Sequence, residues 1–207
     1  QGDLRTIKTD CPVLLRYGVE KTPDNKQSFL ACMAEIYSYE KKEMETIPVK
    51  EFQQVLCDNI TLDIFVQLQN GNLVSQFSDK KSMKNKNTKV DISLYSDQIL
   101  YKNIDKREES QVLFLKHCII SYEIFLTYLK KPNVTINHTF LWDVMTRPIL
   151  FHKGVNLAIF ELMQDDITNK VKLVCPTNHY ASPLFDEKKP TVFLLKNEDF
   201  SYLLGIT

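Results

Sequence analysis

The stretch TPDNKQSFLACMAEIYS, residues Thr22–Ser38, brings a hydroxyl and a thiol, Ser28 and Cys32, to the start of an expected helix. Free backbone N–H groups and the helix dipole stabilise an anionic nucleophile at such a position. A Ser nucleophile also needs a base, an orienting group and an oxyanion hole, and Ser28 lies outside any GxSxG turn. Because Ser is a favoured N-cap, we predict that Ser28 caps this helix. We predict that Cys32, one turn further, is a small buried residue.

The histidines decide whether a base or a metal ligand is available. A pair of Cys32 with His179 or His152 is the thiol and imidazole combination that would make an active cysteine peptidase. The chain has no HxxxH or CxxC spacing, so we expect no metal site, and we expect no cofactor. It also has no P-loop, GxGxxG or HExxH motif, which argues against nucleotide hydrolysis and zinc proteolysis. The four histidines are His117, His138, His152 and His179.

The composition is that of one folded, soluble domain. The chain has 207 residues, 43% hydrophobic and 25% charged, and its 26 basic and 26 acidic side chains balance. We expect no nucleic-acid partner, because phosphate binding favours a basic excess. The five cysteines form no CxxC pair, which favours free thiols in the cytoplasm. We expect no membrane partner, because no apolar run approaches the roughly 18 residues of a membrane span. The start at Gln1 without Met leads us to expect a domain excised from a longer protein.

Hydrophobic periodicity and turn residues predict helices first and strands last, which is an α+β arrangement. The basic, Asn-rich stretch Asp79–Lys89 is expected to be a solvated loop because no aromatic residues alternate with its lysines. The expected helices cover 27–42, 48–58, 61–69 (stopped by Asn70-Gly71), 108–131 and 138–146, and the expected strands cover 155–162, 170–176, 190–195 and 200–206.

Two distant stretches resemble one enzyme family. NKQSFLACMAEIY, Asn25–Tyr37, is similar to the motif of OTU-type deubiquitinating cysteine proteases in which an Asp-Gly-Asn turn delivers the nucleophilic Cys to a helix. KKPTVFLLKNEDFSYLLGI, Lys188–Ile206, resembles the family's closing β-hairpin, which supplies the catalytic His. The order of elements between them is similar too. The resemblance implies an OTU/papain-like α+β fold over residues 1–207, with helices packed on a small, mostly C-terminal sheet.

The resemblance breaks at the catalytic positions. Asp199 stands where the family has its His, and Phe200 replaces the following Tyr. A carboxylate with an ordinary pKa of about 4 is too weak a base to activate an alcohol. The segment NHY around His179 copies the family's histidine step, but we expect this His to be exposed or locally bonded. In the nucleophile motif, the Asp, Gly, Asn and Cys positions hold Asn25, Lys26, Gln27 and Ser28.

These substitutions lead to three functional hypotheses. The first is a catalytically inactive OTU-like domain, a pseudo-deubiquitinase that binds a protein, with ubiquitin or a ubiquitin-like protein as the candidate partner. The second is an active peptidase that uses Cys32. The third is a virion structural or assembly domain, because LLRYGVEK, Leu14–Lys21, and CPTNHY, Cys175–Tyr180, also look like a segment of large proteins of the nucleocytoplasmic large DNA viruses. The location expected is the cytoplasm, or the virion for a viral protein.

Overall fold

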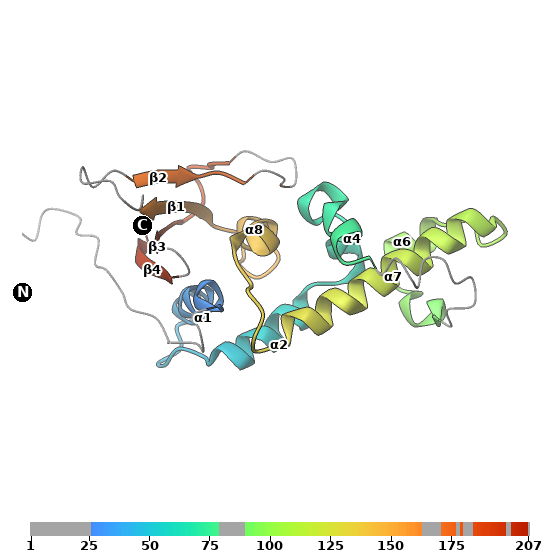
Figure 1. Cartoon of the computed structure of the whole chain (residues 1–207), viewed down its shortest axis with the longest axis horizontal. Coiled ribbons are helices and arrows are strands. Elements are labelled where there is room, and N and C mark those ends of the chain that lie inside the picture. Colours follow the sequence, from blue (N-terminus) through green and yellow to red (C-terminus); the bar gives the residue numbers. More distant parts are fainter. Residues whose placement is uncertain are drawn as a thin grey trace, which may run out of the picture.

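The computed structural model describes residues 26–78, 90–162, 171–176, 179, 184–197 and 200–206. Asn25, Asp199 and the stretch Asp79–Lys89 lie outside these residues. Within the described part, a helical region precedes a C-terminal sheet, which confirms the α+β class (Figure 1). The OTU/papain-like type of fold stays a prediction.

The predicted helices and strands are observed in the expected order, and the short elements η3, α4, η4 and α6 were not predicted. Thirteen elements are described, of which η3 and η4 are 3₁₀ turns. They are α1 (Ser28–Lys41), α2 (Val49–Asn59), α3 (Leu62–Phe65), η3 (Leu68–Gly71), α4 (Asn72–Gln76), η4 (Ile92–Tyr95), α6 (Ile99–Asn103), α7 (Glu109–Leu129), α8 (His138–Thr146), β1 (Asn156–Leu162), β2 (Val171–Val174), β3 (Thr191–Asn197) and β4 (Phe200–Ile206).

Among the predicted helices, the one expected at 61–69 is longer than the helix observed there. It ends at Phe65, and the chain then turns through three left-handed residues, Gln69 (φ 51°), Asn70 (φ 54°) and Gly71 (φ 86°). A tertiary contact compensates for this conformation, since the backbone N–H of Gln69 donates to the buried carboxylate of Asp143 at 2.7 Å. Asp143 is 74 residues away in the chain, so local periodicity carries no signal for it.

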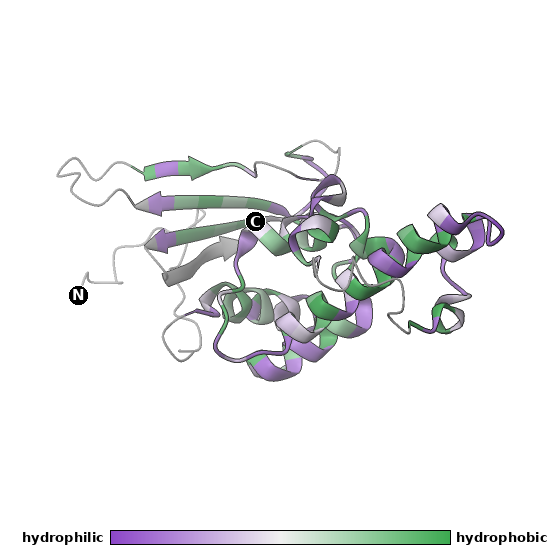
Figure 2. Ribbon diagram, turned by 45° about the vertical axis from the view of Figure 1, so that its right-hand side comes forward, coloured by the Kyte–Doolittle hydropathy of each residue, from purple (hydrophilic) through white to green (hydrophobic). Residues whose placement is uncertain are grey.

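The sheet has four strands in the order β2-β1-β3-β4. The central pair, β1 and β3, is parallel, with Leu157 opposite Val192 and Ile159 opposite Leu194. The outer pairs, β1 with β2 and β3 with β4, are antiparallel. Figure 2 shows the two inner strands as largely hydrophobic, as expected where both faces of a strand contact protein or a pocket.

One face of the sheet lies in the core. Helix α1 packs against β4, and α8 packs against β1. The inward residues Leu157, Ile159, Val192 and Leu194 are at most 5% exposed. On the other face, the rings of Phe160 and Phe193 stack with centroids 6.3 Å apart, so the period-2 alternation of β1 and β3 separates a covered face from an outer one.

The remaining helices pack chiefly around α7 and form an arm that extends away from the sheet (Figure 1). The ring of Phe125 lies 5.2 Å from that of Phe65 and 5.0 Å from that of Phe77, measured between centroids. The Tyr122 hydroxyl donates to the carbonyl of Ile60, the C-cap of α2, at 2.7 Å. The expectation of helices packed on the sheet therefore holds for α1 and α8, whereas α7 packs against other helices, and the buried residues of both parts belong to one hydrophobic core.

Helix α7 corrects the expectation that no apolar run is long enough to cross a membrane. Its 21 residues have a mean hydropathy of 1.5 over the most apolar window, enough for a span by length and composition. A core helix of a soluble protein passes the same test. The side chains of Leu115, Ile119 and Phe125 are fully buried in the arm, so one face of α7 is such a core face.

Candidate functional site

The start of α1 differs from the predicted cap. Ser28 is the first helical residue, and the N-cap is Gln27, whose side chain makes no capping hydrogen bond. The Gln27 side chain instead donates from Nε2 to the carbonyl of Lys131 at 2.7 Å. The carbonyl of Lys26 accepts from the backbone N–H of Ile136 at 3.2 Å. These contacts attach the turn to the connection between α7 and α8, and they explain why Ser28 is not the cap.

The structure describes only some of the positions that correspond to catalytic residues in the resembled family. Ser28 is 7% exposed, so little of it is accessible to a substrate. Its helix packs against β4, the strand that begins directly after Asp199. Asn25 and Asp199, which hold two further positions of the motifs, lie outside the described residues.

Cys32 has the environment of a structural thiol. Its side chain is fully buried, which confirms the predicted small buried residue. Burial, with a smaller contribution from the charge of Glu35, raises the pKa of Cys32 to about 12. The thiol therefore stays protonated near neutral pH, whereas a cysteine nucleophile must be a thiolate.

The histidines proposed as partners of Cys32 have other contacts. The carbonyl of His179, a half-buried residue, accepts a hydrogen bond from the side-chain amide of Asn70 in the left-handed turn. His152 is exposed, and its backbone N–H donates to Glu40 at 3.2 Å. Both contacts are made by backbone atoms, so they position the two residues without assigning a role to either imidazole.

The other two histidines lie in apolar surroundings. Burial lowers the pKa of His138, whose ring lies edge-on to those of Phe29 and Trp142. Burial also lowers the pKa of His117 on α7. In the described part of the chain, no three side chains of His, Cys, Asp or Glu come together as metal ligands.

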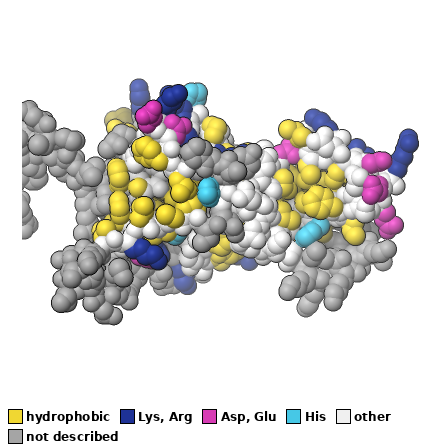
Figure 3. All heavy atoms as spheres, turned by 90° about the horizontal axis from the view of Figure 1, so that it is seen from above, with side chains coloured by type: hydrophobic (Ala, Val, Ile, Leu, Met, Phe, Trp, Pro, Cys, Tyr) yellow, Lys and Arg dark blue, Asp and Glu magenta, His cyan; other side chains and the backbone are white. Residues whose placement is uncertain are grey.

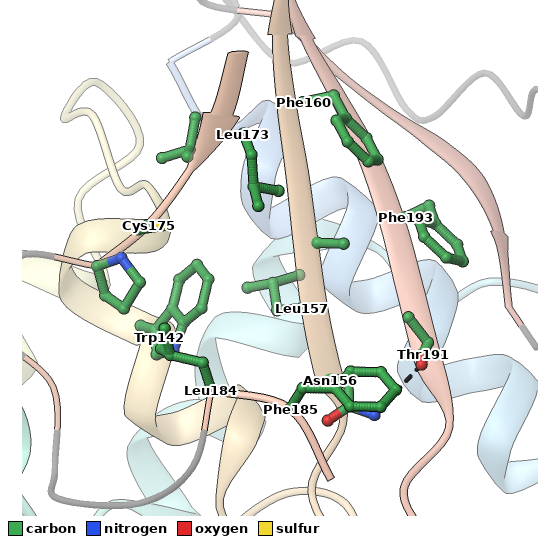
Figure 4. A pocket seen from close by; sticks show the side chains of 13 residues that line it. Trp142, Asn156, Leu157, Phe160, Leu173, Cys175, Leu184, Phe185, Thr191 and Phe193 are labelled. Carbon is green, nitrogen blue, oxygen red and sulfur yellow. Dashed lines mark hydrogen bonds between the residues drawn. The ribbon is translucent and has the colours of Figure 1, made fainter. Parts of the chain in front are cut away.

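An apolar hollow lies beside the outer face of the sheet (Figure 4). It has a volume of about 500 Å³, within the range of about 300 to 1,000 Å³ typical of ligand pockets. Its exposed lining side chains include three large apolar ones: Leu173 of β2 (54%), Leu184 (48%) and Phe185 (63%). The lining is mainly apolar and includes Trp142, Leu157, Phe160, Leu173, Phe185 and Phe193.

Asn156, a polar residue in the lining, makes its hydrogen bonds to other residues of the pocket wall. Its Nδ2 donates to the carbonyls of Asp186 (2.8 Å) and Lys189 (3.2 Å) and to Oγ1 of Thr191 (3.2 Å). Its Oδ1 accepts from the backbone N–H of Asp186 at 2.8 Å. Asn156 thus attaches the segment before β3 to β1, and the pocket offers a ligand chiefly apolar contacts.

Replacing Asn156 by Ala is expected to lower the free energy of unfolding by about 1 to 3 kcal/mol, because it leaves partly buried backbone groups without partners. Thermal and denaturant unfolding would measure this loss. Asn59→Ala is the matched control, since Asn59 is exposed and makes one local bond to Val55; we expect a change within about 0.5 kcal/mol. Equal losses in the two variants would show that Asn156 does not anchor the wall.

Comparison of the chain with protein-family models, with curated proteins and with solved structures finds no match. The architecture and the pocket therefore define the protein as an α+β domain with an apolar site on its sheet.

The sequence analysis missed the residues around this pocket. Leu184 and Phe185 lie between turn-forming residues, Pro183 and Asp186. Two large apolar residues in a polar connection are a signal that could have indicated a surface site. Their alignment with Leu173 and Trp142 depends on strand pairing and could not be derived from local patterns.

Proposed function

We propose that the protein is a catalytically inactive, OTU-like domain that binds a protein partner. The observation that carries the proposal is the apolar pocket, whose rim leaves Leu173, Leu184 and Phe185 exposed to water. Burial of a large apolar side chain contributes about 1.5 to 3 kcal/mol, so a partner that covers this rim gains affinity. The buried, protonated Cys32 supports a binding role over cysteine catalysis.

The candidate partner is ubiquitin or a ubiquitin-like protein, bound through an extended segment. Strand β2 is an edge of the sheet and stands beside the pocket. An edge strand can add a further strand from a partner, while a neighbouring pocket takes an alternate side chain. Leu173 contributes to both features, because it belongs to β2 and lines the pocket.

A titration of ¹⁵N-labelled ubiquitin with the domain tests this function. We expect chemical-shift changes on ubiquitin that saturate at micromolar to millimolar domain and that Leu173→Asp abolishes. Leu94→Asp is the control, because Leu94 is 75% exposed on η4 in the helical arm. Unchanged ubiquitin spectra at millimolar domain, and unchanged spectra for ubiquitin-like proteins, would refute this partner class.

A structural or assembly domain, in a virion if the parent protein is viral, is the second candidate function. The observation that favours it is a cluster of exposed apolar residues on the helical arm, which includes Leu113 and Phe114 of α7. This cluster is separate from the pocket, because the residues that line the pocket belong to the sheet, to α8 and to their connections.

A further inference from the structure

Helix α7 is apolar on two opposite faces. One face lies in the core of the arm and carries Leu115, Phe125 and Leu129, all fully buried. At 100° per residue, Leu113, Ile120 and Ile124 lie on the opposite side of the helix. Leu113 is 46% exposed, Ile124 is 37% exposed and Ile120 is half-buried. A helix that is hydrophobic all round normally has both faces covered.

The exposed face has the spacing of a coiled-coil seam. Leu113, His117, Ile120, Ile124 and Thr127 follow each other at alternating intervals of four and three residues, the pattern of a and d positions in a heptad. The C-terminal half of the seam is hollowed into a shallow groove lined by Ile120, Ile124 and Thr127. Figure 3 shows hydrophobic side chains gathered at the arm end of the molecule. We call this surface the α7 seam; its residues are Leu113, His117, Ile120, Ile124 and Thr127.

Charges along one edge of the α7 seam alternate in sign. Glu109, Lys116, Glu123 and Lys130 follow each other at intervals of seven residues, so all four occupy the same flanking heptad position. Glu109, Glu123 and Lys130 are exposed, and Lys116 is half-buried. Flanking charges of this kind set the partner and the orientation of paired helices.

We propose that the α7 seam binds the α7 seam of a second copy of this chain, with the two helices antiparallel. In an antiparallel pair, the same flanking position of both helices meets along one edge. The register that places Lys116 against Glu123 of the second copy also places Glu109 against Lys130 of the second copy. Two-fold symmetry repeats both pairs, so every charge in the row meets its opposite.

The same register also aligns the residues of the seam in pairs. Leu113 lies opposite Ile124 of the second copy, and Ile120 lies opposite His117 of the second copy. Glu123 already accepts a hydrogen bond from the hydroxyl of Tyr95 at 3.1 Å, which holds this carboxylate at the edge of the seam. A parallel pair lacks the charge match, because the edge opposite the row of charges would carry Phe114 and Tyr128.

A lipid surface fits the seam less well than a second copy. A bilayer would cover the apolar residues but would also have to accommodate the row of charges at its edge, which is costly at membrane depth. A second copy covers Leu113 and Ile124 and pairs the charges.

The experiment measures the dissociation constant of self-association by sedimentation equilibrium, using the full chain. Glu123→Lys and Lys116→Glu are each expected to weaken the dimer about tenfold or more, because each places like charges together twice. The double variant is expected to recover the original constant. The two single variants mixed with each other should form a heterodimer, since their altered charges are complementary.

Ile124→Glu is expected to abolish the dimer, and thermal unfolding of the monomer checks that the half-exposed site has not affected folding. Met44→Glu is the control, because Met44 is fully exposed in the loop after α1 and lies outside the seam; its dissociation constant should not change. A chain that stays monomeric at millimolar concentration overturns the proposal. A dimer whose dissociation constant does not change in the charge-reversal variants also overturns it. A third contrary result is a chain that forms no dimer but binds phosphatidylcholine and phosphatidylserine vesicles, with Ile124→Glu abolishing that binding.

Discussion

A soluble thiol reagent should label Cys32 in the folded protein on the order of 10³-fold more slowly than a cysteine of ordinary pKa at pH 7.5. Burial raises the pKa of Cys32 from the ordinary thiol value of 9.0 to about 12. Because the thiolate is the reactive form, this rise lowers the reactive population at pH 7.5 by a factor on the order of 10³. The complete burial of Cys32 in α1 slows access further.

Cys175 is the internal reference for this measurement, because it is a free, exposed thiol directly after β2. Mass spectrometry of peptides after timed alkylation would give both rates, with Cys175→Ser and Cys32→Ala identifying each product. In denaturant the two rates should converge.

The same thiols test the peptidase hypothesis directly. We expect that a ubiquitin-derived electrophile does not modify Cys32, and that ubiquitin chains of each linkage remain uncleaved with or without Cys32→Ala. Rapid modification of Cys32, or cleavage that Cys32→Ala abolishes, would show that the domain is an active cysteine peptidase and would refute the proposed loss of catalysis.

Gly154→Ala should lower the free energy of unfolding by about 3 kcal/mol or more, from left-handed strain plus a backbone clash. Gly154 has a φ of +72°, and an added Cβ would lie 2.2 Å from the carbonyl oxygen of Thr146 and 2.6 Å from its carbonyl carbon. The backbone N–H of Val155 donates to Met145 at 2.9 Å, so the end of α8 and the start of β1 are held together and cannot separate to admit the methyl group.

Gly71→Ala is the matched control. Gly71 also has a positive φ, +86°, but its added Cβ would meet only the carbonyl of Val66 at 3.5 Å, an ordinary contact. We expect a loss of about 1 to 2 kcal/mol, the conformational term alone. Since each kcal/mol lowers the melting temperature of a domain of this size by about 2 to 4 °C, calorimetry should separate the two variants. Similar melting temperatures would show that the approach of Gly154 to Thr146 can relax.

The local elements were predictable because their signals are local. The long helix expected at 108–131 is observed at Glu109–Leu129, and the strand expected at 155–162 is observed at Asn156–Leu162. The burial of Cys32 followed from its apolar neighbours on α1. The sequence could not show that α7 is apolar on two faces, because that distinction depends on which side the other helices cover.

The errors came from contacts between distant residues. The helix after Thr61 ends early because Asp143 accepts the Gln69 N–H, and the turn before α1 bonds to Lys131. Neither partner is near its contact in the chain, so no window of sequence contains both.

The sequence by itself determined the α+β class of the protein, with helices first and strands last. Periodicity, turn residues and residue chemistry are properties of neighbours in the chain, and they are sufficient for that. The tertiary structure alone decided the parallel pairing of β1 with β3, the pocket between Trp142 and Phe185, and the solvent-facing side of α7. These features depend on distant segments burying apolar surface against one another, and the binding surfaces are what that packing leaves exposed.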